Sequence, residues 1–133
     1  MTSKLSVDTI QGVSQAGSIA VIAEGGSTTT NLQQGLAKVY HSGSADGATL
    51  NGSLNVSTLT DTATGKQNIT LTSNTSDNNY SITTGVGNKE DGDARDTMIR
   101  SATTSGYQAL VYSTISSAFA DGALCSSILG DLA

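Results

Sequence analysis

A catalytic centre needs reactive side chains within reach of one another, and this sequence offers few. His41 is its only histidine, Cys125 is its only cysteine, and the two lie far apart along the chain. A hydrolase needs a nucleophile, a base and an orienting group, yet none of the many serines lies in a nucleophile-elbow motif. We therefore predict no enzyme, no catalytic residue and no cofactor, and we expect His41 on a strand with its ring at a surface or an interface.

The single cysteine and the single histidine also limit metal and disulfide chemistry. Zinc sites combine several Cys and His ligands at short spacings, which one of each cannot supply. A lone cysteine cannot form a disulfide within its own chain. We expect Cys125 to be a small buried apolar residue rather than a reactive thiol.

The sequence has one cluster of charged residues, Lys89-Glu-Asp-Gly-Asp-Ala-Arg-Asp96. Asp91, Asp93 and Asp96 are oxygen ligands of the kind that calcium prefers, but their spacing does not match the EF-hand loop. A solvated loop over residues 88–95 is the simpler interpretation. Whether the three aspartates bind a cation stays open, and a glycosidase pair among these carboxylates is the weakest alternative.

The balance of charge argues against nucleic acid and membranes as partners. The net charge is −5, the pI is about 4.4, and six Lys and Arg residues form no basic stripe of the kind that binds phosphates. The longest apolar run, residues 19–23, is far too short to cross a bilayer. The first residues also lack the apolar segment of a secretory signal.

The composition favours short strands joined by polar turns. Ser and Thr number 38, Gly 15 and Asn eight, and there is no Pro. Many β-branched residues with few charges are typical of strands rather than disorder. Large apolar side chains are scarce, with only four Tyr and one Phe, so the core is thin and each chain gains stability by association. This is the first indication of a homo-oligomer.

Residues 1–30 are predicted to form an extended arm rather than a domain. The alternation in residues 4–10 and the apolar run at 19–22 indicate two short strands, and residues 25–30 form a Gly-Ser-Thr joint. We expect the arm to bind a neighbouring protein or subunit by strand addition. Its anchors would be Leu5, Val7, Ile10, Ile19, Val21 and Ile22.

Residues 31–133 are predicted to form an all-β domain, an antiparallel β-sandwich or jelly-roll-like fold. Short alternating segments recur with polar turns between them and without a long helical period. Strands are expected at 36–41, 54–59, 67–72, 80–86, 97–102, 106–113 and 123–129. The second and third of these form a hairpin about a turn at 61–65, and 114–119 is either a further strand or a helical turn.

The segment Gly106–Ser113 has apolar side chains on both faces, because Tyr107 and Val111 alternate with Leu110 and Tyr112. Such a strand is central in a sheet or lies at an interface. Tyr107, Val111 and Tyr112 are therefore candidate interface residues, and with the thin core they favour a homotrimer.

The hairpin region resembles bacteriophage virion proteins, including tail-fibre proteins of marine phages. The resemblance rests on Asn51-Gly-Ser-Leu-Asn-Val-Ser-Thr-Leu-Thr-Asp-Thr-Ala-Thr-Gly65, then Gln67-Asn-Ile-Thr-Leu-Thr72 and Asp77-Asn-Asn-Tyr80. The opening Ser3-Lys-Leu-Ser-Val-Asp-Thr-Ile10 is similar to the start of such proteins. The family pattern A-W-V-x-F-x-G is matched without its Trp at residues 37–43, and its V-x-V-x-G-D ending is matched only loosely at 123–131.

This resemblance implies a structural protein of a phage particle, in a family whose members are usually homotrimers. The net charge of −5 favours a position on the outer surface of the particle, away from the packaged DNA. Its partners would be other copies of itself and the major capsid protein or another virion protein. A capsid-decorating role, as a cement or head-fibre protein, is slightly favoured over a tail fibre. The alternative is a receptor-binding appendage in which Tyr40, Tyr107 and Tyr112 stack on a host surface glycan. An enzyme acting on the cell surface ranks last.

Overall fold

The computed structural model describes residues 5–11, 19–22, 29–31, 36–87 and 94–130. The described residues form strands and turns and contain no helix. They divide into two compact units, Met1–Leu36 and Ala37–Ala133. The second unit begins six residues after the boundary that the sequence predicts, because Ala37 is the first residue of a core strand.

The first unit contains one short antiparallel ladder. Strand β1 (Ala20–Ile22) pairs with β2 (Thr29–Asn31), with Val21 opposite Thr30. Residues 5–11 form no strand, although their apolar and polar residues alternate. An isolated two-stranded ladder has little stability of its own.

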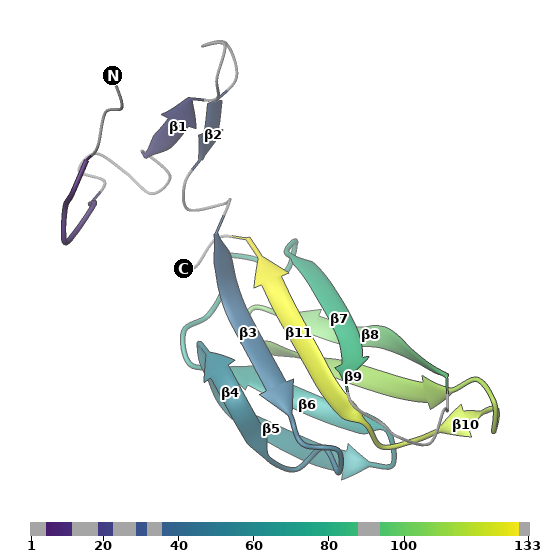
Figure 1. Ribbon diagram of the computed structural model, residues 1–133. Helices are drawn as coiled ribbons and strands as arrows, with labels where there is room; N and C mark the ends of the chain where they lie inside the picture. Colours follow the sequence, from purple (N-terminus) through teal and green to yellow (C-terminus); the bar gives the residue numbers. More distant parts are fainter. Residues whose placement is uncertain (1–4, 12–18, 23–28, 32–35, 88–93, 131–133) are drawn as a thin grey trace. The chain divides into compact units, whose positions relative to one another are not determined.

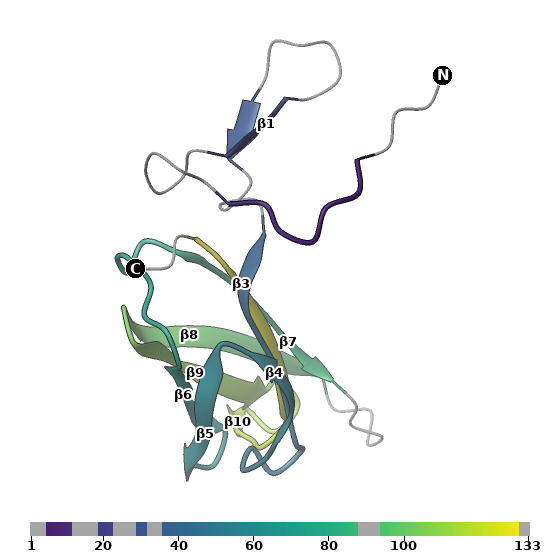
Figure 2. The same ribbon diagram turned by 90° about the vertical axis from the view of Figure 1, so that its left-hand side faces the viewer.

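The second unit is a β-sandwich of two antiparallel sheets, and this confirms the predicted fold class. Sheet I has the order β4 (Leu50–Leu54), β3 (Ala37–Gly43), β11 (Ala123–Leu129), β7 (Ser81–Gly87). Sheet II contains β5 (Val56–Ala63), β6 (Lys66–Leu71), β9 (Gly106–Ser113), β8 (Arg95–Thr103) and the short β10 (Ala118–Phe119). Figures 1 and 2 show the two sheets as separate layers whose strands cross obliquely.

Strand β9 is the centre of sheet II, as its two apolar faces predict. It pairs with β8 along residues 106–113, and β6 and β10 pair with successive parts of it, at 106–110 and 112–113. Its inward side chains alternate with outward ones, as strand geometry requires. They belong to the core of the sandwich, which consists of Val39, Val56, Ile69, Leu71, Tyr107, Ala109, Val111, Leu124 and Ile128.

Two tight backbone positions connect the strands. Gly65 ends the hairpin turn between β5 and β6 with φ of +66°, a conformation that glycine adopts without steric cost. The turn consists of Thr64 and Gly65 alone, because β5 continues through residues 61–63 that were predicted as part of the turn. Asn55 (φ +58°) stands at the corner where the chain passes from β4 in sheet I to β5 in sheet II. Its side chain donates from Nδ2 to Ser73 O (3.0 Å) and accepts from Ser73 N (2.7 Å), which fixes the corner against the end of β6.

Each of the seven strands predicted between residues 36 and 129 overlaps an observed strand. The alternative for 114–119 resolves into a turn at 114–117 followed by β10. Between residues 36 and 129, strand β4 was not predicted, because Asn51-Gly52-Ser53 has the composition of a turn. Strand β2 was not predicted either, since Thr29 and Thr30 fall within the expected joint at 25–30. The predicted charged loop lies mostly outside the described residues, and Arg95, its last residue, begins β8.

Candidate functional site

The most distinctive polar feature is a cluster between the two sheets. His41 from β3 and Ser126 from β11 are cross-strand partners in sheet I, and Tyr107 reaches them from β9 in sheet II. Ser126 Oγ lies 2.8 Å from His41 Nδ1, and Tyr107 OH lies 3.4 Å from the same nitrogen. Tyr107 OH also bonds to Ser126 Oγ. The three side chains meet because each occupies an inward position on its strand.

Burial determines the electrostatics of this cluster. His41 is 1% exposed and Tyr107 is 3% exposed. Burial lowers the pKa of His41 to about 4, because the charged imidazolium loses its hydration. Burial raises the pKa of Tyr107 to about 12, against the opposing effect of its bond to Ser126. The prediction that the His41 ring lies at a surface or an interface is therefore wrong: His41 follows Val39 by two residues, so both point into the core.

The cluster contains the beginning of a nucleophile–base pair, since Ser126 Oγ and His41 Nδ1 are within hydrogen-bonding distance. Catalysis by such a pair also requires access for a substrate and a group that orients the base. Ser126 is 7% exposed, and His41 Nε2 is buried and has no hydrogen-bond partner among the described residues. As it stands, the arrangement links the two sheets through hydrogen bonds.

The three tyrosines expected to stack on a glycan lie on different parts of the sandwich. Tyr40 is half exposed on the outer face of sheet I, since its neighbours Val39 and His41 point inward. Tyr112 is half-buried on the outer face of sheet II, between the buried Val111 and Ser113. Tyr107 lies in the core, so the glycan platform of Tyr40, Tyr107 and Tyr112 is not assembled.

The candidate interface on β9 needs the same correction. Tyr107 and Val111 are core residues of their own chain, because inward side chains of a central strand are covered by the opposite sheet. Tyr112 alone remains partly accessible. Its ring makes an edge-to-face contact with Phe119 at 5.7 Å between centroids, and Lys66 Nζ lies 5.1 Å from the Phe119 centroid.

The predicted anchors of the arm keep their apolar side chains in contact with solvent. Leu5 is 79% exposed, and Val7, Ile10, Val21 and Ile22 are each at least half exposed. Ile19 is half-buried. Exposed apolar residues are ordinary when scattered, but here they follow one another along a segment that contributes nothing to the described core.

The three aspartates that were considered as cation ligands are only partly described by the structure. Asp91 and Asp93 lie outside the described residues, whereas Asp96 is exposed on β8 and its Oδ1 accepts from Thr97 N at 2.8 Å. Within the described ranges, no group of three His, Cys, Asp or Glu residues could hold a metal ion. No helix in the described part of the chain is long and apolar enough to cross a membrane.

Cys125 differs in part from its prediction. It is half-buried, on the outer face of sheet I between Ser42 and Gly85. Its Sγ lies 3.6 Å from Ser42 Oγ. The residues before and after it, Leu124 and Ser126, take the inward positions of β11, which leaves the thiol facing outward.

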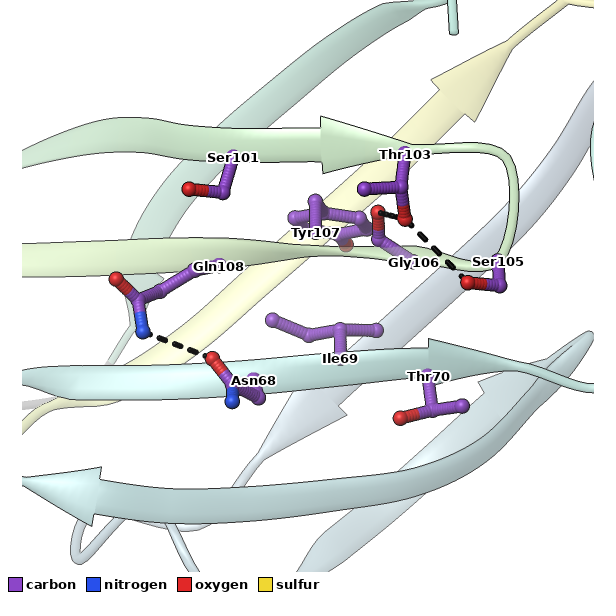
Figure 3. Close-up of a pocket in the computed structure, with 9 residues that line it drawn as sticks. All are labelled: Asn68, Ile69, Thr70, Ser101, Thr103, Ser105, Gly106, Tyr107 and Gln108. Carbon is purple, nitrogen blue, oxygen red and sulfur yellow. Dashed lines mark hydrogen bonds between the residues drawn. The ribbon is translucent and has the colours of Figure 1, made fainter. Parts of the chain in front are cut away.

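A shallow depression of about 320 Å³ lies on sheet II, where β8 bulges away from β9. Ser101 at the bulge has φ of +56°, and Figure 3 shows it on β8, with Gln108 on the neighbouring strand β9 and Asn68 one strand further away on β6. The lining residues are Asn68, Ile69, Thr70, Ser101, Thr103, Ser105, Gly106, Tyr107 and Gln108. None of them is charged, so this depression offers hydroxyl and amide groups and no acid, base or anion-binding group.

Two amides organise one side of this depression. Gln108 Nε2 donates to Asn68 Oδ1 at 2.9 Å, because the two residues are direct partners in the β6–β9 ladder. On the other side, Thr103 Oγ1 donates to Gly106 O at 3.0 Å. These residues were not predicted as a site, although Asn68 and Gln108 occupy outward positions of two predicted strands.

Comparisons with known proteins give no relative for this chain: no family model, no curated protein and no solved structure matches it.

Proposed function

We propose that this chain is a non-catalytic structural protein of a bacteriophage particle, which assembles as a homotrimer and reinforces or extends the outer surface. A capsid-decorating role is our first candidate. In this proposal the sandwich is the exposed body of the protein, and the N-terminal segment binds other copies or the major capsid protein.

The observation that carries the proposal is the contrast between the two units. The sandwich buries a continuous core of nine residues from both of its sheets. The N-terminal segment instead leaves Leu5, Val7, Ile10, Val21 and Ile22 exposed. Apolar side chains become stabilising only when they are removed from water, at roughly 25 cal/mol per Å². The exposed apolar side chains of the N-terminal segment would therefore gain stability if a partner covered them. A segment of this kind suits a role in assembly better than a role in catalysis.

The composition supports the same role. The chain bears few reactive groups, and its faces consist largely of small polar residues. Each neutral hydrogen bond contributes only about 1 kcal/mol net, but a chain held at several points in a symmetric shell gains from all of them together. The acidic net charge also suits the outside of a particle that packages DNA, where phosphate contacts are not required.

The test is rebinding to particles that lack the protein. The full chain should bind such particles, and a chain without residues 2–24 should remain folded but fail to bind. Ile115→Ser serves as the matched control, because Ile115 is an equally exposed apolar residue outside the arm, and this variant should bind normally. A truncated chain that still decorates particles would contradict the proposal.

A second candidate function is that of a tail-fibre or receptor-binding appendage, and the depression on sheet II favours it. Its neutral lining of hydroxyl and amide groups suits a ligand rich in hydroxyls, such as a host surface glycan. The lining lacks an exposed aromatic ring, so we expect weak binding. Glycan-array binding that disappears in Gln108→Ala and persists in Thr60→Ala, a variant elsewhere on sheet II, would favour this candidate over decoration.

A further inference from the structure

Strands β7 and β8 face each other along one side of the sandwich. Each is the last strand of its sheet, and a hydrogen bond links Thr84 Oγ1 to Thr97 Oγ1 at 2.8 Å. On the opposite side the chain turns from β4 into β5 at Asn55. We call the side between β7 and β8 the β7–β8 seam and define it by Ile82, Thr84, Val86, Thr97 and Ile99.

The seam leaves inward side chains incompletely covered. Ile82 and Val86 pair with Ile128 and Leu124 on β11, which are fully buried, yet Ile82 and Val86 themselves are only half-buried. On the facing strand, Ile99 is 36% exposed, although its partner Ala109 is fully buried. The inward side chains of the edge strands β7 and β8 are therefore more exposed to solvent than those of the neighbouring strands β11 and β9.

Edge strands normally resist the addition of further strands, through charges, bulges or short length. Strand β8 has Arg95, Asp96 and Arg100 and a bulge near Ser101. Strand β5 has two irregularities in its register, and β4 is short and also irregular.

Strand β7 has none of these protections. It pairs with β11 through seven consecutive residues without a bulge, and its sequence Ser-Ile-Thr-Thr-Gly-Val-Gly contains neither a charge nor a proline. Among the edges that the structure describes, β7 is the one best suited to accept another strand.

The N-terminal segment has the complementary properties. The segment of residues 5–11 has the same length as β7, seven residues, and belongs to no strand. Along an extended segment Leu5, Val7 and Thr9 share one face, and Ser6, Asp8 and Ile10 lie on the other. Leu5 and Val7 are exposed, so both side chains are available for a contact outside their own unit.

We infer that residues 5–11 of one copy add to the free edge of β7 in a second copy, with Leu5 and Val7 inserted into the β7–β8 seam. Backbone hydrogen bonds along β7 would provide the affinity. The alternation of side chains would determine which face of residues 5–11 points into the seam. This inference rests on the proposed function, because it names the partner of the arm as a second copy of the same chain.

Disulfide trapping tests the contact on the full chain. In a Cys125→Ser background, one batch carries Val7→Cys, and three others carry Ile82→Cys, Thr84→Cys or Val86→Cys to cover the possible registers. A disulfide forms only when the two β-carbons approach within about 4.5 Å. Leu59→Cys is the matched control, because Leu59 is a half-buried inward residue of another edge strand, β5. Thermal melting checks that each variant folds.

The expected result is a Val7-linked heterodimer with at least one of the three β7 positions, at several-fold higher yield than with position 59. Equal yields, or no heterodimer with folded variants, would overturn the inference. A chain carrying both Val7→Cys and the reactive β7 cysteine that closes its disulfide internally at high dilution would also overturn it.

Deletion of residues 2–11 separates this inference from the proposed function. If the deletion abolishes assembly but β7 does not cross-link, β7 is not the acceptor and the structural role stands. If the deletion leaves both the oligomeric state and particle binding unchanged, the role of the arm fails as well.

Discussion

Ser126 Oγ lies 2.8 Å from His41 Nδ1, although 85 positions separate the two residues in the sequence. Tyr107 approaches both from the opposite sheet. Buried polar groups are usually hydrogen-bonded within the protein, and the bonds of this cluster connect β3, β11 and β9. It therefore makes the packing of the two sheets sensitive to the protonation state of a single histidine.

We expect the sandwich to lose stability in mild acid because of His41. Its pKa is about 4 in the folded chain, against 6.5 in its ordinary state, so the unfolded chain binds the proton more readily. The contribution of His41 is fully present above pH 6.5 and falls as the pH drops toward 4. The loss should reach about 3 kcal/mol, at about 1.4 kcal/mol per pKa unit. Urea unfolding at several pH values measures it.

The variant His41→Gln provides the control for this acid sensitivity. It replaces the titrating ring with a neutral polar side chain, so its free energy of unfolding should change little between pH 6.5 and pH 4. If the variant retains the slope of the parent chain over that range, His41 is not the group responsible.

Removal of the Tyr107 hydroxyl should destabilise the sandwich moderately. Tyr107→Phe keeps the buried ring and deletes the bonds to Ser126 and His41, which should cost about 1–2 kcal/mol. Tyr112→Phe is the matched control on the outward side of the same strand, and its cost should stay within about 0.5 kcal/mol. Equal effects of the two variants on chemical denaturation would contradict the role of the cluster.

Gly65 should tolerate no side chain. At φ of +66° an added β-carbon would lie 2.5 Å from Val111 O and 2.7 Å from Ala120 N, so strain and collision combine. We expect Gly65→Ala to lower the free energy of unfolding by well over 1 kcal/mol. Gly85→Ala, where nothing lies within 4 Å of the added carbon, should be neutral or slightly stabilising. Thermal melts of the two variants should therefore diverge, and similar melts would disprove the steric argument.

The sequence predicted the strands well because alternation is a local signal. The hairpin of β5 and β6 follows from apolar residues two positions apart on each side of a glycine turn. The two apolar faces of residues 106–113 indicated a central strand, and β9 pairs on both sides. Strand β4 was missed because its Asn-Gly-Ser segment owes its pairing to β3, which is a tertiary contact.

The candidate site was less accessible from the sequence, for the same physical reason. A lone histidine on a strand gives no sign of whether its face is covered, and the covering residues Ser126 and Tyr107 come from distant segments. The apolar character of Tyr107 and Val111 correctly indicated burial, but it could not distinguish the opposite sheet from a second molecule. The depression on sheet II depends on a bulge in β8 near Ser101. Residues 97–102 were expected to form a regular strand, and their sequence gives no local sign of the bulge.

The measurement that most directly tests the structural role is heat-induced genome release from particles with and without this protein, with adsorption to host cells measured in parallel. Decoration predicts that particles lacking the protein release their genome at a lower temperature while adsorption stays nearly unchanged. Addition of the full chain should restore the release temperature. Unchanged release with a collapse of adsorption would contradict the decorating role and favour a receptor-binding appendage.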